Sequence, residues 1–126
     1  MFSTFTDPSK RERYEVLLSS EKGRMKVRSS LDHFGDLDLR YCKKLAGAEQ
    51  RQTRISELLR GLGAPHDCYV ISSNSEVDGK ELQLDDALDL VVGRGCGTFV
   101  CCVPGALAYF EGESAGERYL CRRENR

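Results

Sequence analysis

The chain has 126 residues, of which 40% are hydrophobic and 31% charged, and its formal net charge is −1. This length fits one domain with its own core, and the composition excludes a disordered chain. No apolar run approaches the ~18 residues that a membrane span needs. The first residues lack a basic segment followed by an apolar one, so we expect no secretory signal and a cytoplasmic location.

The N-terminal end is predicted to be frayed over residues 1–7 and to enter a short helix or turn at residues 8–12. The pair Asp7–Pro8 is typical of a helix start, because Asp caps the first amides and Pro fits the first helical position. Apolar residues then alternate on both sides of the turn-like run 19–23, which favours a β-hairpin over residues 14–28. A helix that ends within this run is the competing interpretation.

The clearest helical pattern covers residues 43–62. Apolar residues recur there every three or four positions, which predicts an amphipathic helix that ends at Gly61, Gly63 and Pro65. On such a helix, extended upstream to residue 40, several basic side chains would share one side. They are Arg40, Lys44, Arg51 and Arg54.

The C-terminal half is predicted as a strand, a helix and a three-stranded meander. The expected elements are strand 68–72, helix 82–92, and strands 98–103, 106–111 and 118–122. The first strand is almost wholly apolar, which is typical of burial on both faces. Pro104–Gly105 specifies a type II turn between the second and third strands. The last strand is expected at the sheet edge, before a frayed tail at residues 123–126.

These elements predict one α+β domain over residues 1–126. In this fold a mixed, mainly antiparallel sheet ends in the C-terminal β-meander, and two main helices pack on one face of the sheet. If strands 68–72 and 98–103 are parallel neighbours, the helix between them makes a right-handed crossover.

Six cysteines without repeated spacing predict neither a zinc site nor a disulfide framework, and we expect reduced, mostly structural thiols. Cys96 lies in a glycine-rich loop and is the candidate nucleophile of a Cys/His enzyme, with His33 or His66 as the base. No family-specific motif surrounds any of the six. We therefore favour a non-catalytic protein and predict no catalytic residue, cofactor or metal.

The glycines at positions 93, 95 and 97 have the spacing of a phosphate loop but follow a helix instead of opening one. The negative end of that helix would face a phosphate, which is unfavourable. Together with the basic helix over residues 40–60, the Gly93–Gly97 loop still supports an alternative function as a nucleic-acid- or nucleotide-binding protein.

Charge is unevenly distributed along the chain. Residues 1–62 carry 13 Lys and Arg against 9 Asp and Glu, whereas residues 63–126 carry 6 against 11. The halves either attract each other within the domain or steer a charged partner. Acidic residues gather in the loop before the helix at 82–92 and in its first turn. They are Glu76, Asp78, Glu81, Asp85 and Asp86. We expect them to bind another protein with a basic surface, as in a small inhibitor, immunity protein or adaptor.

Overall fold

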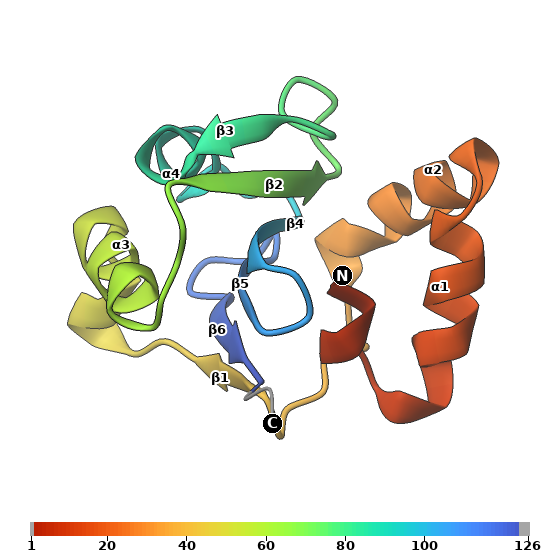
Figure 1. The fold of residues 1–126 in the computed structure, drawn as a ribbon, viewed down its shortest axis with the longest axis horizontal. Coiled ribbons are helices and arrows are strands. Elements are labelled where there is room, and N and C mark those ends of the chain that lie inside the picture. Colours follow the sequence, from red (N-terminus) through yellow and green to blue (C-terminus); the bar gives the residue numbers. More distant parts are fainter. Residues whose placement is uncertain (1, 124–126) are drawn as a thin grey trace.

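The computed structural model describes residues 2–123, in which a six-stranded sheet lies between two pairs of α-helices (Figure 1). The helices are α1 (Arg11–Leu18), α2 (Glu21–Ser30), α3 (Gln52–Gly61) and α4 (Leu84–Val91). The strands are β1 (Cys42–Lys44), β2 (Asp67–Ser72), β3 (Glu81–Gln83), β4 (Thr98–Val103), β5 (Leu107–Glu111) and β6 (Arg118–Arg122). Short 3-10 helices cover Phe2–Phe5, Pro8–Lys10, Leu31–His33 and Gly47–Gln50.

The strand order is β1-β6-β5-β4-β2-β3, and every neighbouring pair is antiparallel. The predicted α+β fold with its C-terminal meander is confirmed. The sheet contains no parallel pair among the described strands, so β2 and β4 need no crossover. β6 lies inside the sheet and not at its edge, because β1 pairs with it and sets Cys42 opposite Cys121.

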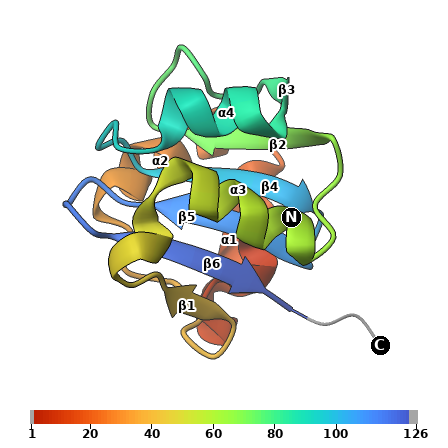
Figure 2. The same ribbon diagram turned by 90° about the vertical axis from the view of Figure 1, so that its left-hand side faces the viewer.

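Each face of the sheet has its own apolar core. α3 and α4 cover one face, as predicted for the two main helices, and α1 and α2 cover the other (Figure 2). Successive residues of a strand point to opposite faces, so the central strands supply both cores. Val100 and Tyr109 pack toward α3 and α4, whereas Phe99 and Phe110 pack toward α1 and α2.

The predicted hairpin over residues 14–28 is wrong, because two successive helices, α1 and α2, lie there and are joined by a short turn. The hydroxyl oxygen of Ser20 accepts a hydrogen bond from the amide of Gly23 at 3.0 Å and so caps the start of α2. Gly23 also packs directly against the carbonyl of Leu17, where a larger residue would clash. The alternation of apolar residues on which the hairpin prediction was based does not reflect burial, since Val16 is 64% exposed and contributes nothing to the core.

The N-terminal segment, predicted to be frayed over residues 1–7, contacts the segment before β1 from Phe5 to Asp7. Phe2–Phe5 forms a 3-10 helix, Phe5 is buried, and Thr6 makes an isolated bridge with Leu37. At the other end, the amide of Arg123 still donates to the carbonyl of Ala106 at 2.8 Å. The remaining residues of the two predicted frayed ends, 1 and 124–126, lie outside the described residues.

The predicted helix over residues 43–62 is too long at its start, because α3 begins only at Gln52. Before it, β1 joins the sheet, and the amide of buried Leu45 donates to the carbonyl of Arg118 at 2.9 Å. Gly47 then has a φ of 45°, which no residue of a right-handed helix adopts. The region is therefore strand, 3-10 turn and helix in succession.

The predictions for the C-terminal strands hold closely. β4 and β6 have the expected bounds, and β2 is buried along most of its length. At the turn between β4 and β5, Gly105 has a φ of 72° and the amide of Ala106 donates to the carbonyl of Val103 at 3.0 Å. None of the helices within residues 2–123 is long and apolar enough to cross a membrane.

Candidate functional site

An open hollow of about 430 Å³ lies on the sheet face that α1 and α2 cover, at the end beside edge strand β3. We call it the β3 hollow. Among the described residues its lining comes from β2, β3, β4 and the turn after β4. The side chains of Tyr69, Ile71 and Cys101 form its apolar floor, and Asp67, Glu81 and Pro104 lie around them.

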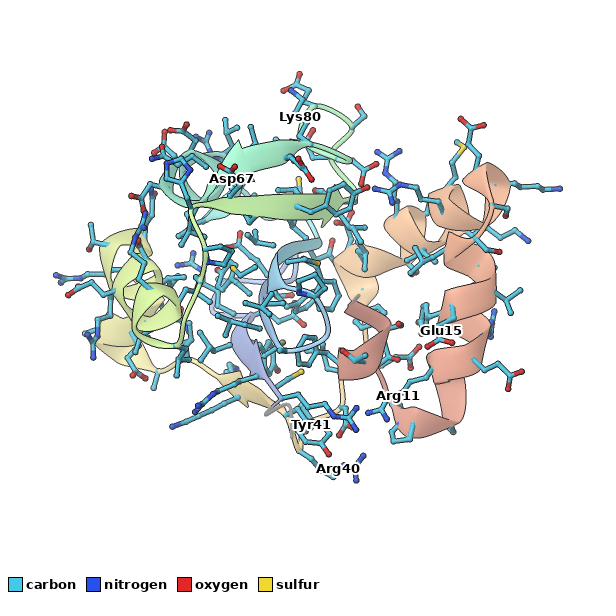
Figure 3. All side chains as sticks on the ribbon, in the orientation of Figure 1. Arg11, Glu15, Arg40, Tyr41, Asp67 and Lys80 are labelled. Atoms are coloured by element: carbon cyan, nitrogen blue, oxygen red, sulfur yellow. The ribbon has the colours of Figure 1, made fainter. Side chains whose placement is uncertain are left out.

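The strand register explains why these residues meet. Asp67, Tyr69 and Ile71 alternate along β2 and therefore point to one face. Tyr69 pairs with Cys101 on β4 and with Glu81 on β3, which brings both neighbours to the same side. Asp67, which the sequence analysis did not select, is thus the second carboxylate at the hollow, and Figure 3 shows it at the start of β2.

The Tyr69 ring is held in place by α2. The guanidinium carbon of Arg24 lies 5.5 Å from the centre of the ring, a cation–π distance. Arg24 also donates to Asp78 at 3.1 Å, and Arg28 lies 3.2 Å from the other oxygen of the same carboxylate. These contacts fasten α2 to the loop between β2 and β3.

Asp78 is therefore occupied within the molecule. Its side chain is only 10% exposed, and it accepts a further hydrogen bond from the amide of Ser72 at 2.9 Å. Its two arginines come from the basic half of the chain, so attraction between the halves accounts for part of the charge asymmetry. We consequently remove Asp78 from the residues that we expect to contact a partner.

The other predicted acidic residues lie in the loop between β2 and β3, on β3 itself and in the first turn of α4. Asp85 accepts hydrogen bonds from Ser56 at 2.6 Å and from Arg60 at 2.8 Å, and these bonds lower the pKa of its carboxyl. Glu76, Glu81 and Asp86 are exposed and form no ion pair with any described residue. Asp67 is 71% exposed and lies 2.8 Å from a ring nitrogen of His66. We call the exposed residues Asp67, Glu76, Glu81 and Asp86 the acidic edge.

The predicted basic residues are not brought together on one helix. Arg40 precedes β1, Lys44 lies on β1, and Arg51 and Arg54 lie at the start of α3. Arg40 is also engaged, because its guanidinium donates to Asp38 at 2.8 and 3.0 Å. The four residues therefore do not share one helix.

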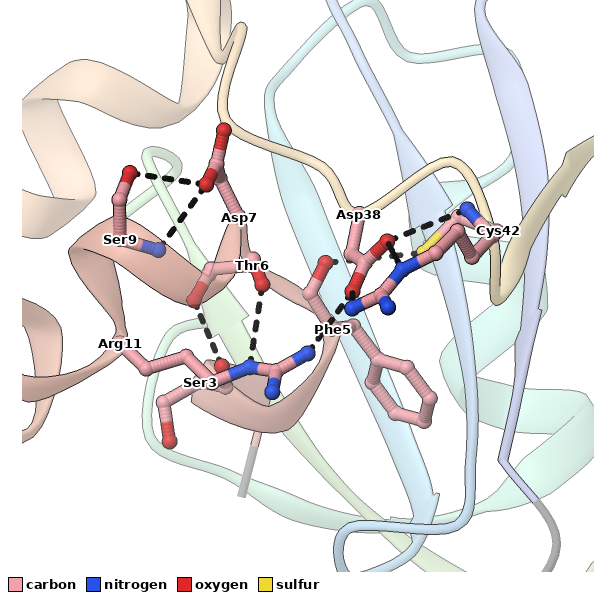
Figure 4. A network of polar contacts seen from close by, with 9 residues as sticks. Ser3, Phe5, Thr6, Asp7, Ser9, Arg11, Asp38 and Cys42 are labelled. Atoms are coloured by element: carbon pink, nitrogen blue, oxygen red, sulfur yellow. Dashed lines mark hydrogen bonds and ion pairs between the residues drawn. The ribbon is translucent and has the colours of Figure 1, made fainter.

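Asp38 is the centre of a polar cluster that fastens the N-terminal segment (Figure 4). Its carboxylate is 4% exposed and also accepts a hydrogen bond from Arg11 at 2.8 Å. Its amide donates to the carbonyl of Phe5 at 2.7 Å. The cluster joins α1, the N-terminal 3-10 helix and the turn before β1, and its groups satisfy one another.

The Gly93–Gly97 loop follows α4, as predicted, and binds carboxylates of the protein itself. The Gly93 amide donates to both oxygens of buried Glu111 at 3.0 and 3.1 Å, and the Gly97 amide donates to Asp32 at 2.6 Å. Tyr109 donates its hydroxyl to Glu111 at 2.7 Å. Two of the amides that a phosphate would need are thus engaged, and the loop connects distant parts of the fold.

No hydrogen bond among the described residues joins the candidate nucleophile Cys96 to either histidine. The Cys96 thiol contacts the carbonyl of Arg94 at 3.9 Å, whereas His33 pairs with Glu113 at 2.6 Å and His66 with Asp67. The described residues contain no hydrogen bond between a thiol and an imidazole, and no cluster of three or more metal-ligating side chains.

Four of the other five thiols are held in the neutral form. Burial raises the pKa of Cys101 and of Cys102 to about 12 and that of Cys68 to about 11, and it also raises the pKa of Cys121. All six cysteines are free. The thiol in the floor of the β3 hollow therefore behaves as a neutral, weakly polar group.

Selective alkylation tests this distribution of thiols. We expect Cys96 to react with iodoacetamide first at neutral pH, and the buried cysteines to react only when the protein unfolds, because the thiolate is the nucleophile. Mass spectrometry of peptides after timed labelling measures the order. A Cys96→Ser variant should lack the fast reaction. Labelling of Cys68 or Cys102 as fast as that of Cys96 in the folded protein would contradict the prediction.

Comparison of the chain with known protein families, with curated proteins and with solved structures found no match.

Proposed function

We propose that the protein is a small, non-catalytic binding module that recognises a basic segment of another protein through the acidic edge. The observation that carries this proposal is the contrast between two groups of carboxylates. Asp38 and Asp78 are almost buried and each binds two arginines. The acidic edge is exposed and has no arginine or lysine partner among the described residues, so its charge is available to a ligand.

The surroundings of the acidic edge favour a polypeptide ligand. β3 is an edge strand with a single neighbour, and such an edge can accept an extended segment by backbone hydrogen bonds. The β3 hollow next to it offers apolar surface, which charge alone does not provide. Exposed carboxylates would increase the association rate with a basic partner and contribute less to the lifetime of the complex. Inhibitor, immunity and adaptor roles all fit such a surface.

Charge reversal tests the proposal. The wild-type protein and the variant Glu76→Lys, Glu81→Lys, Asp86→Lys are used as baits in extracts of the source cell. We expect the variant to lose a basic protein that the wild type captures. The association rate of that protein, once purified, should fall about tenfold or more in the variant and should fall with salt for the wild type.

A matched control separates the acidic edge from net charge. The variant Glu12→Lys, Glu15→Lys, Glu57→Lys makes the same change in charge at exposed positions on α1 and α3. It should retain the captured protein with an association rate close to that of the wild type. Equal capture by all three baits, with unchanged rates, would refute the proposed function.

A further inference from the structure

We infer that the β3 hollow receives an arginine side chain, which anchors the basic segment that the acidic edge attracts. This inference rests on the proposed function and specifies the chemistry of the ligand. The β3 hollow has a volume typical of small-ligand sites and combines an apolar floor with carboxylates at its border. A partner side chain that suits it must therefore carry a positive charge on an apolar, flat body.

The positions of the two carboxylates fit a guanidinium. Asp67 lies opposite Gln83 on β3, so Glu81 is its diagonal neighbour on the same face. Diagonal neighbours in an antiparallel pair are roughly 7–8 Å apart, a separation that leaves room for a group that donates to both. The planar guanidinium has five N–H donors and binds carboxylates with paired hydrogen bonds. The ammonium of lysine is a compact, strongly hydrated charge and matches this geometry less well.

The floor of the β3 hollow favours the same group. Tyr69 presents an aromatic ring, Ile71 is buried, and the Cys101 thiol is neutral, so the methylene groups and the flat face of an arginine would replace water over apolar atoms. Arg24 already shows this chemistry in the same molecule. Its guanidinium stacks on Tyr69 while it pairs with the carboxylate of Asp78.

Alternative uses of the β3 hollow fit less well. An anionic ligand would meet Asp67 and Glu81, and Arg24, which lies over the Tyr69 ring, is already paired with Asp78. A purely apolar side chain would bury the floor but desolvate two carboxylates without pairing them, which is costly. The carboxylates at the border of the β3 hollow therefore favour a cation, and its apolar floor favours a cation with a flat apolar face.

Nuclear magnetic resonance with short peptides tests the inference. The probes are acetyl-Gly-Arg-Gly-amide and the same peptide with citrulline, which has the shape of arginine without its charge, or with lysine. We expect the arginine peptide to cause saturable shifts of the Tyr69, Ile71 and Cys101 amides. The citrulline peptide should bind about tenfold more weakly or not at all, and the lysine peptide more weakly than the arginine peptide.

Two double variants locate the charge that matters. The double variant Asp67→Asn, Glu81→Gln should bind the arginine peptide about tenfold more weakly, because it removes the carboxylates of the β3 hollow. Glu76→Gln, Asp86→Asn removes the same charge from the acidic edge outside the β3 hollow and should leave the affinity within about twofold. Both variants should keep the wild-type spectrum elsewhere, which verifies their folding.

The outcomes separate this inference from the proposed function. Absence of saturable shifts at the β3 hollow, equal binding of the citrulline or lysine peptide, or equal loss in the two double variants would each overturn the arginine site. A basic protein captured through the acidic edge would still support the proposed function in that case. Conversely, arginine-specific binding at the β3 hollow supports the site even if no protein is captured.

Discussion

Replacing Gly97 with alanine is expected to destabilise the protein by roughly 3 kcal/mol or more, because the new methyl group would overlap backbone atoms. Gly97 precedes β4 and packs against the carbonyl of Leu31 and the amide of Asp32. Backbone cannot rotate away as a side-chain end can. The Gly97 amide also donates to the Asp32 carboxylate, so any shift that relieves the overlap lengthens this bond. The contact joins the end of α2 to the sheet.

Urea unfolding of the variant measures the loss, and Gly61→Ala provides the control. Gly61 lies in the last turn of α3 with no atom within 4 Å of the position of the added carbon. Alanine there should stabilise the protein slightly, by up to about 1 kcal/mol, because it favours the helix. If Gly97→Ala unfolded at the wild-type urea concentration, the close packing of β4 against the 3-10 helix at Leu31–His33 would be refuted.

Replacing Asp38 with asparagine is expected to cost about 2–4 kcal/mol at neutral pH, because it leaves Arg11 without its carboxylate in a largely buried position. The amide of asparagine keeps the size of the side chain but not its charge. The bonds from the guanidinium of Arg40 would weaken as well. Glu12→Gln, at an exposed position on α1, is the control and should change stability by less than about 0.5 kcal/mol.

The pH dependence of this difference gives a second measurement. The hydrogen bonds from Arg40 hold the pKa of Asp38 below its ordinary value. A carboxylate of this kind stabilises the folded state fully above its unfolded pKa of about 3.9, and the stabilisation is lost as the pH falls through the folded value. The unfolding free energies of the wild type and of Asp38→Asn should therefore differ at neutral pH and become similar below about pH 4. A difference in unfolding free energy that stays constant down to acid pH would contradict the proposed role of the Asp38 charge.

Local signals in the sequence were sufficient where an element is defined by its neighbours along the chain. Pro104–Gly105 and the apolar runs on both sides predicted the β4–β5 hairpin, and the periodicity of α4 predicted that helix to within two residues at its start. The N-terminal hairpin failed because Tyr14, Val16 and Leu18 alternate, and a short helix produces the same pattern when one of the three is exposed.

Where an element depends on pairing with a distant segment, its conformation could not be predicted from the local sequence. Residues 43–51 have helical spacing, but β1 pairs with β6, which lies more than seventy positions later in the chain. The β3 hollow likewise depends on the order of β4, β2 and β3, which places Cys101 beside Tyr69. A signal for Asp67 existed, since it continues the alternation of Tyr69 and Ile71. It was missed because residues 82 and 83 were assigned to a helix and residue 81 to the loop before it, which left Asp67 without a neighbouring strand.

The two-sided core of the sheet has a consequence for synthesis. The apolar side chains of the first forty residues, such as Phe5 and Val27, belong to the same cluster as Phe99, Phe110 and Cys121. On the ribosome, α1 and α2 therefore emerge long before the strands that cover them have been translated. We expect the N-terminal helices to remain undocked until β5 and β6 have left the exit tunnel, so that the domain completes its folding only after its last strand has been translated.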